Sequence, residues 1–404
     1  MRKHLIKSAA ATTLALSVTA ALAGSGVTGA VAGSRQDAMR EVVRHTLDFG
    51  APGFMARIDD GRRVTVTAAG VADRDTGRRL TGHEQFEAGS NTKTFVAVLA
   101  LQLVDRGRLV LDAPIERYLP DVVPNGGAIT VRMLLQHTSG LFNYTGDEVF
   151  NTKVFDPDWT PTPTELLGYA FRNDPEFAPG TSWSYSNTNY ILAGMLVEKL
   201  TGTGLADLIQ QRIAGPLGLT RTYLADPRAT GTGRGYAHGY TIDFSGPEPV
   251  HHDTTGWSLA WGGAAGAVIS DQRDLARFFS ALLGGRLISP ERLADMKTTV
   301  PVPASFPVTG GYGLGLMRKD TPCGPVWGHG GDTNGHHSTA VTTADGRRTA
   351  ISDTTMSPTG IDPRRYLQLA LAAEDVLACR MLGEPVPAAV LDRLRGTAPL
   401  PPAQ

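Results

Sequence analysis

Ser90 and Lys93 are the first residues whose types and spacing suggest chemistry, because they stand three positions apart in the run Ser-Asn-Thr-Lys. On a helix this spacing places both side chains on one face, with about 5–6 Å between their Cβ atoms. A serine hydroxyl is a poor nucleophile near neutral pH, and a neighbouring amine activates it, especially where burial lowers the pKa of that amine. The pair therefore predicts an activated serine nucleophile.

Residues 95–104, which follow this pair, are apolar on nearly every side and predict a helix buried in the middle of the protein. The start of such a helix presents free N–H groups where an oxyanion would form. The alternative is an N-cap serine beside a surface lysine. A lysine at the head of an otherwise apolar helix disfavours that alternative.

Two further polar motifs lie downstream, Tyr185 with Asn187 and His329 with Gly330 and Gly331. A phenol near a lysine ammonium can lose its proton at a lower pH and act as a base, and an asparagine can both donate to and accept from a substrate amide. Glycines after the histidine would let a substrate backbone lie against a strand edge. Taken singly, a core tyrosine in a polar loop and a satisfied core histidine are the alternatives.

The order Ser-x-x-Lys, Tyr-x-Asn, His-x-Gly is the signature of penicillin-binding proteins and serine β-lactamases. On these motifs the chain resembles the penicillin-recognising serine hydrolases, the family of the class C β-lactamases and of exocellular D-alanyl-D-alanine carboxypeptidase/transpeptidases. The resemblance extends from about residue 40 to residue 379, and the segments 134–141, 185–190 and 311–316 support it.

The resemblance implies a role for each motif residue. Ser90 would form an acyl-enzyme, and Lys93 and Tyr185 would move its proton and later prepare water or another acceptor. The backbone N–H groups of Ser90 and Asp332 would form the oxyanion hole, and His329 stands where many relatives carry lysine. No metal and no cofactor is implied. The expected substrate-binding residues are Asn187, His329, Gly330, Gly331, Asp332, Trp261 and Arg318.

The His-x-Gly motif departs from the carboxypeptidase pattern in one respect. Carboxypeptidase relatives usually carry Thr or Ser in the middle of the motif, and often a hydroxyl just after it, and both help to hold the free carboxylate of the departing D-residue. Here these positions are Gly330 and Asp332. Glycine offers no side-chain donor, and an ionised Asp332 repels an anion unless Arg318 compensates. Relatives that cleave D-aminoacyl amides, esters or internal D-peptide bonds therefore become candidates.

We expect a hydrolase or acyl-transferase for D-amino-acid peptides, amides or esters, of the D-alanyl-D-alanine carboxypeptidase type or the D-stereospecific amidohydrolase type. Its small substrates would include peptidoglycan stem peptides. A β-lactamase or a related esterase is the alternative, because motifs do not report how fast an acyl-enzyme deacylates. A non-catalytic sensor of penicillin or muropeptides is a third interpretation, which the complete set of catalytic positions disfavours.

Strand-like runs at both ends of the chain and helical patterns between them predict the fold that positions these residues. We expect an α/β (α+β) protein in which one antiparallel sheet, made from the two termini and flanked by helices, carries an inserted all-helical lobe at about 106–253. This β-lactamase/transpeptidase-like catalytic domain would occupy 35–380. The Pro- and Ala-rich segment 383–404 predicts a flexible tail.

Residues 1–32 have the pattern of an export signal. A basic start is followed by an Ala/Leu/Val run over 9–23, with small-residue cleavage sites after Ala23 and Ala32. A transmembrane anchor is the alternative, which the Thr, Ser and Gly residues within the run disfavour. We therefore expect a secreted, extracellular protein without a stable membrane anchor.

The overall composition limits the partners. A net charge of −1 over 404 residues offers no attraction to nucleic acid or anionic lipid, and we expect a monomer. Cys323 and Cys379 are the only two cysteines, and an oxidising exterior would let them join, whereas two buried free thiols are the alternative. In the carboxypeptidase type that the chain resembles, a disulfide lies at these places.

Overall fold

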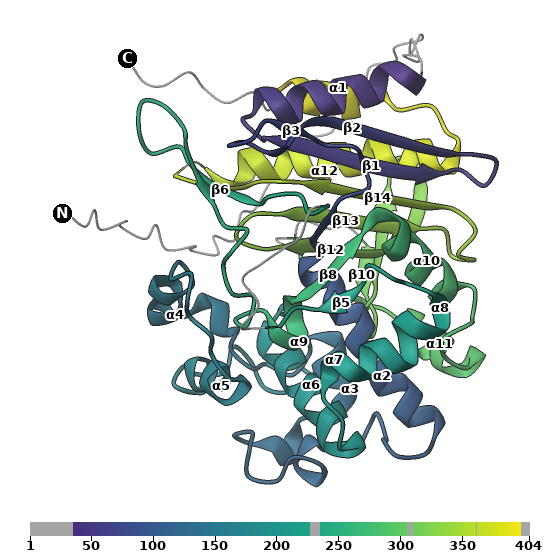
Figure 1. Cartoon of the computed structure of the whole chain (residues 1–404). Coiled ribbons are helices and arrows are strands. Elements are labelled where there is room, and N and C mark those ends of the chain that lie inside the picture. Colours follow the sequence, from purple (N-terminus) through teal and green to yellow (C-terminus); the bar gives the residue numbers. More distant parts are fainter. Residues whose placement is uncertain (1–34, 227–234, 305, 307–309, 361, 397–404) are drawn as a thin grey trace, which may run out of the picture.

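The computed structural model describes residues 35–226, 235–304, 306, 310–360 and 362–396, so the expected export signal lies outside the described residues. Its centre is a nine-stranded antiparallel sheet in the order β3-β2-β1-β14-β13-β12-β11-β10-β9. Strands β1 and β14, which come from opposite ends of the chain, lie side by side (Figure 1). This confirms the expected antiparallel sheet made from both ends. The strands are β1 (Gly53–Asp59), β2 (Val64–Asp73), β3 (Arg78–Arg79), β9 (Val300–Pro301), β10 (Gly310–Tyr312), β11 (Met317–Thr321), β12 (Gly324–Asp332), β13 (His337–Thr342) and β14 (Thr349–Thr354).

Three helices from the two ends of the chain cover one face of this sheet: α1 (Arg35–Asp48), α12 (Pro363–Leu382) and α13 (Ala388–Arg395) (Figure 1). Their apolar sides form one core with the sheet, in which Val42, Phe54, Val341 and Val376 are buried. Against the opposite face pack α10 (Gln272–Leu283) and the helical lobe. Both faces of the central strands are therefore buried.

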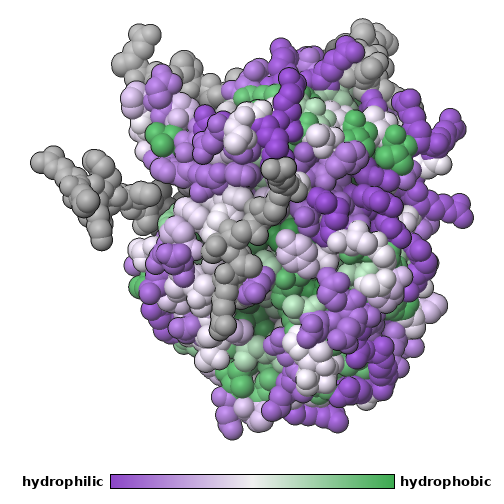
Figure 2. All heavy atoms as spheres, viewed as in Figure 1, coloured by the Kyte–Doolittle hydropathy of each residue, from purple (hydrophilic) through white to green (hydrophobic). Residues whose placement is uncertain are grey.

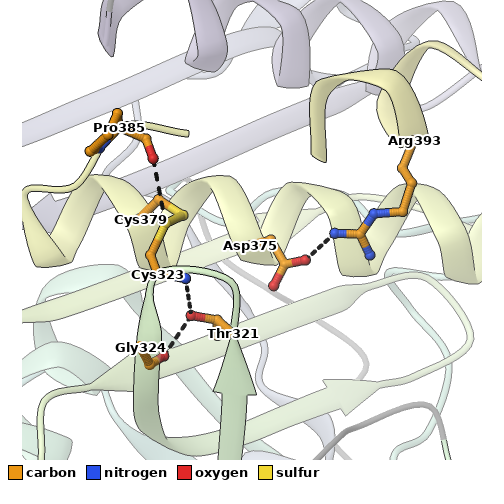
Figure 3. The surroundings of a disulfide bond; sticks show 7 residues. All are labelled: Thr321, Cys323, Gly324, Asp375, Cys379, Pro385 and Arg393. Atoms are coloured by element: carbon orange, nitrogen blue, oxygen red, sulfur yellow. Dashed lines mark hydrogen bonds and ion pairs between the residues drawn. A yellow bond between two sulfur atoms is a disulfide. The ribbon is translucent and has the colours of Figure 1, made fainter. Parts of the chain in front are cut away.

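Helix α13 corrects the expectation that 383–404 is a flexible tail. Val390, Leu391 and Leu394 are buried, at a spacing that places them on one side of a helix. Arg393 of this helix pairs with Asp375 of α12 (Figure 3). The tail prediction is therefore wrong for 388–395, because a short apolar stripe outweighs the Pro- and Ala-rich composition.

The helical lobe surrounds α2 (Thr92–Asp105), whose residues from 92 to 103 are all buried. Helix α6 (Asn187–Thr201) and α9 (Gly263–Gly266) pack against it. On the surface that Figure 2 shows, hydrophobic residues gather in the lower half of the molecule, over the lobe. The other helices here are η1 (Gly89–Asn91), η2 (Ile115–Arg117), η3 (Gly126–Ala128), α3 (Val131–Gln136), η4 (Tyr144–Gly146), α4 (Glu148–Lys153), α5 (Pro163–Phe171), α7 (Leu205–Ile209), η5 (Gln210–Ala214), α8 (Gly215–Leu217) and α11 (Pro290–Lys297).

Two small sheets join the lobe to the rest of the protein. The first has the order β4-β8-β5, with β4 (Gln85–Glu87), β8 (Val268–Asp271) and β5 (Tyr223–Leu224). The second has the order β15-β6-β7, with β15 (Ser357–Thr359), β6 (Tyr240–Asp243) and β7 (Val250–Asp253). Because β4 leads directly into η1 and α2, the first sheet holds the segment that carries Ser90.

Cys323 and Cys379 form a disulfide that joins the β11–β12 turn to α12 (Figure 3). Their Cα atoms lie 5.1 Å apart, and the bond closes a loop with a sequence separation of 56. This confirms the pairing. Among the helices of the described ranges, none is long and apolar enough to span a bilayer.

Candidate active site

Lys93 connects three segments of the chain through its amine. Its Nζ atom lies 2.8 Å from Ser90 Oγ, 2.7 Å from Asn187 Oδ1 and 2.8 Å from the carbonyl oxygen of Ala265. The Lys93 side chain is fully buried in the first turn of α2. The structure therefore brings the predicted serine, lysine and asparagine together, from η1, α2 and α6.

Burial moves the pKa values of Lys93 and Tyr185 in opposite directions. It lowers the pKa of Lys93 well below its ordinary value, although the Asp332 charge acts the other way. Burial raises the pKa of Tyr185, although a hydrogen bond with Ser90 acts the other way. Burial thus favours the uncharged form of both groups. The expectation that the phenol loses its proton at a lower pH is therefore wrong, because burial raises the pKa of Tyr185.

Asn187 is held from both ends of its side chain. Its Oδ1 accepts from Lys93, and its Nδ2 donates to Thr145 Oγ1 at 3.3 Å. Its backbone N–H donates to Asn143 Oδ1 at 3.0 Å. Helix η4 and the residue just before it therefore orient the amide that the sequence predicts to bind substrate.

His137 is a residue of this site to which the sequence analysis assigned no role. Its fully buried ring lies 4.4 Å from the Tyr185 ring, and its Nδ1 accepts from the backbone N–H of Ser186 at 3.2 Å. Burial lowers the pKa of His137 well below its usual value, so the ring is neutral and the acceptor is available. The segment 134–141 supported the family resemblance, but only the fold shows that this histidine supports the tyrosine.

His329 is a neutral residue in this structure. Its Nδ1–H donates to the carbonyl oxygen of Gly330 at 2.6 Å, and its Nε2 accepts from the Tyr312 hydroxyl at 2.9 Å. Burial, with a further contribution from Lys93, lowers the pKa of His329 to about 3. The position where many relatives carry lysine therefore supplies no positive charge here.

Two glycines allow β12 and η1 to approach each other closely. A Cβ atom on Gly331 would lie 2.0 Å from the carbonyl oxygen of Ala88, and one on Gly89 would lie 2.6 Å from the backbone nitrogen of Asp332. Gly89 also has a φ of +52°, which disfavours other residues. Gly330 is different, because its nearest neighbour would be the Ser338 carbonyl oxygen at 3.6 Å. Side chains are therefore excluded at 89 and 331 but not at 330.

The end of β12 offers a strand edge to a substrate. Pairing of β12 with β11 ends at Gly328 opposite Met317, whereas pairing with β13 continues to Asp332 opposite His337. Residues 329–332 therefore have one edge that no strand in the described part of the chain pairs. An extended substrate backbone could form hydrogen bonds there.

Asp332 is paired with a histidine instead of the arginine that was considered. Its carboxylate is 76% exposed and lies 2.6 Å from His337 Nδ1. Burial acts to lower the pKa of His337, but the Asp332 carboxylate outweighs it and raises that pKa. Arg318 pairs with Asp320 at 2.8 Å. The described partner of the Asp332 carboxylate is therefore His337 and not Arg318.

Trp261 has no hydrogen bond or ring contact with Ser90, Lys93 or Asn187 among the described residues. Its ring packs in the helical lobe, 6.2 Å from the Phe150 ring, and its backbone oxygen accepts from the Tyr144 hydroxyl at 2.6 Å. The described contacts of Trp261 link it to the lobe rather than to Ser90. A substrate contact by this residue stays a prediction.

The comparisons with known proteins agree with this geometry. The Beta-lactamase family model matches residues 39–374. The structure of a D-stereospecific amidohydrolase from Streptomyces sp. is 36% identical, with a TM-score of 0.76, and the match covers 86% of this chain and 98% of that one. A D-amino acid amidase from Ochrobactrum anthropi SV3 is 27% identical, with a TM-score of 0.75 over 86% of this chain and 99% of the other.

Among curated relatives, Penicillin-binding protein 4* of Bacillus subtilis (strain 168) is 29% identical over 291 residues, which are 70% of this chain and 63% of that protein. The chain thus spans less than two thirds of the length of this relative. The family model covers most of this chain, and the match to the amidohydrolase covers nearly the whole length of the amidohydrolase. This chain therefore belongs to the beta-lactamase family of penicillin-recognising serine hydrolases.

Proposed function

We propose that the chain is a serine hydrolase that cleaves D-aminoacyl amide, ester or peptide bonds through an acyl-enzyme on Ser90. The observation that carries the proposal is the buried amine of Lys93, 2.8 Å from the Ser90 hydroxyl. A neutral amine at hydrogen-bond distance can accept the hydroxyl proton as a general base.

The proton pathway follows from the protonation of the two groups. Ser90 Oγ attacks the substrate carbonyl while its proton passes to Lys93 Nζ, and the N–H groups of Ser90 and Asp332 stabilise the oxyanion. The protonated Tyr185 donates to the leaving amine or alcohol and regains a proton from Lys93. Water then attacks the ester on Ser90 by the same steps in reverse, releasing the acid and restoring the enzyme.

Three features favour a leaving group without a free carboxylate. Gly330 supplies no hydroxyl, His329 is neutral, and Arg318 is engaged by Asp320. The whole-length similarity to a D-stereospecific amidohydrolase supports the same substrate class. D-Aminoacyl amides and esters should therefore be cleaved faster than peptides that end in free D-Ala-D-Ala.

A substrate panel tests this proposal. D-Phenylalanine amide, L-phenylalanine amide, a D-aminoacyl ester, a peptide ending in D-Ala-D-Ala, its C-terminal amide and nitrocefin are compared, with Ser90→Ala as control. We expect turnover of the D-amide, little of its L-enantiomer and none by the variant. Faster cleavage of the free acid than of its amide would indicate a D-alanyl-D-alanine carboxypeptidase. Rapid nitrocefin turnover would indicate a β-lactamase.

Secretion and a monomeric state belong to the same proposal. The disulfide supports an oxidising compartment, and residues 1–32 carry the pattern of an export signal. The catalytic domain is taken as 35–380. One similar protein, a penicillin-binding protein homologue from Pyrococcus abyssi, is octameric. Light scattering on the purified protein therefore tests whether this chain is a monomer. Mass spectrometry of culture supernatant should find a mature chain that begins after Ala23 or Ala32.

A further inference from the structure

A second group of buried ionisable residues lies beside the Ser90 segment, and the mechanism above does not use it. Glu87, His336 and Asp353 are 3%, 0% and 0% exposed. His336 Nδ1 lies 3.1 Å from Asp353 Oδ2 and 3.2 Å from Oδ1. The Glu87 carboxylate interacts with the charge of His336. We call these three residues the Glu87–His336–Asp353 cluster.

The cluster joins two segments that carry the expected oxyanion donors. Glu87 ends β4, three residues before Ser90, and His336 lies in the β12–β13 turn, four residues after Asp332. These segments touch closely, because a Cβ on Gly331 would lie 2.8 Å from the backbone nitrogen of Ser90. The relative position of the two N–H groups therefore depends on how β4 is held against this turn.

Thr333 connects the turn to Glu87. Its backbone N–H donates to the His336 carbonyl at 3.0 Å, and its Oγ1 accepts from the backbone N–H of His336 at 3.1 Å. Its hydroxyl also interacts with the Glu87 carboxylate and acts to lower the pKa that burial raises. The turn is thus held to β14 by His336 and Asp353. Next to it, Ser338 Oγ of β13 donates to the carbonyl oxygen of Ala88, between β4 and η1, at 2.9 Å.

The geometry points to the Glu87–His336–Asp353 cluster as the device that sets the spacing of the Ser90 and Asp332 N–H groups, with Glu87 and His336 as positioning residues. The inference rests on the proposed function, because it needs an oxyanion on Ser90. Removing one partner of a buried ion pair leaves an uncompensated charge, which the turn relieves by moving. A displacement of about 1 Å at such a site costs on the order of 10²-fold in rate.

The test compares Glu87→Gln and His336→Gln with Glu374→Gln as matched control. Glu374 forms another buried ion pair, with Lys319, between α12 and β11 on the opposite face of the sheet. Acylation by p-nitrophenyl acetate, inhibition by phenylboronic acid (which forms a tetrahedral adduct) and thermal unfolding are measured. We expect kcat to fall about ten- to a hundredfold in the cluster variants with KM within about twofold, and the boronic acid Ki to rise in parallel. The control should lose thermal stability alone.

An Asp353→Asn variant adds a pH readout. Burial acts to lower the pKa of His336, but Asp353 and Glu87 outweigh it and raise that pKa. Among the described residues, Tyr236, His337 and Tyr366 also face the cluster, and burial raises the pKa values of Tyr236 and Tyr366 well above the usual value. Without the Asp353 charge, His336 loses its proton at a lower pH. The alkaline limb in the pH profile of the acylation rate should then shift to lower pH. The same limb should not shift in Glu374→Gln.

Two results separate the possible failures. Acylation of Ser90→Ala at the wild-type rate would contradict the proposed function itself. Normal acylation of the wild type on Ser90, together with wild-type kcat and boronic acid Ki in Glu87→Gln and His336→Gln, would overturn the positioning role alone. Should His336→Gln fail to fold, Glu87→Gln keeps the side-chain shape and supplies the same comparison.

Discussion

Lys93 donates a 2.7 Å hydrogen bond to Asn187 Oδ1, although the two residues are 94 positions apart in the chain. The carbonyl oxygen of Ala265 accepts a second hydrogen bond at 2.8 Å. Together with Ser90 Oγ at 2.8 Å, these two oxygens surround the Lys93 amine. Asn187 therefore orients the amine that acts as the base in the proposed mechanism.

Lys93 and Tyr185 should act as one proton-handling unit. Lys93→Ala and Tyr185→Phe should each lower kcat/KM by about 10²-fold or more, because each removes one of the two groups that transfer the proton. The double variant should lose little more than the worse single variant, since the two steps depend on each other. Steady-state kinetics on all four proteins measures the coupling. Losses that multiply would assign the residues separate roles.

Asn187→Asp should move the acid limb of the pH profile to higher pH. A carboxylate beside Lys93 stabilises the ammonium form and raises the pKa of the base, which acts only when it is deprotonated. The kcat/KM profile of an amide substrate measures the shift. Thr145→Val, which removes the Asn187 Nδ2 partner without adding charge, serves as control. An unchanged acid limb in Asn187→Asp would show that Lys93 is not the titrating base.

Gly330→Thr should shift specificity toward substrates with a free carboxylate. Position 330 has room for a side chain, because the nearest atom to a Cβ would lie 3.6 Å away. A hydroxyl bound to a charged carboxylate contributes about 1.5–3 kcal/mol, so the kcat/KM ratio of free acid to amide should rise about ten- to a hundredfold. Asp332→Thr should change the ratio in the same direction.

Gly331→Ala is the matched control for these specificity variants. Its Cβ would lie 2.0 Å from the Ala88 carbonyl oxygen, so cleavage of both substrates should fall together. If Gly330→Thr leaves the ratio unchanged, another group of the site governs recognition of the leaving group.

Loss of the disulfide should lower stability without affecting catalysis. In the chain-entropy account, a loop of this length is worth about 4 kcal/mol of unfolding free energy. Cys323→Ala/Cys379→Ala should show that decrease in denaturant titrations and keep its kcat, because the disulfide lies at the opposite end of β12 from Asp332. Reductant should destabilise the wild type but not the double variant. Two free thiols in unfolded, unreduced wild type would contradict the bond.

Local sequence determined several parts of this protein. The apolar run after Ser90 and Lys93 sufficed to predict a buried helix, which is α2, whereas Ser90 itself lies in the short helix η1 that leads into α2. Strand patterns near both ends predicted the antiparallel sheet. These features depend on neighbours a few positions away, so the linear pattern contains them.

Only the tertiary structure decided the state and the partners of the site. The pKa of Lys93 and that of Tyr185 depend on burial by segments far along the chain, which lowers the first and raises the second. The pairing of Asp332 with His337 instead of Arg318 follows from strand register, which no local motif contains. A side chain's protonation and partner are properties of its surroundings, and folding assembles those surroundings from distant residues.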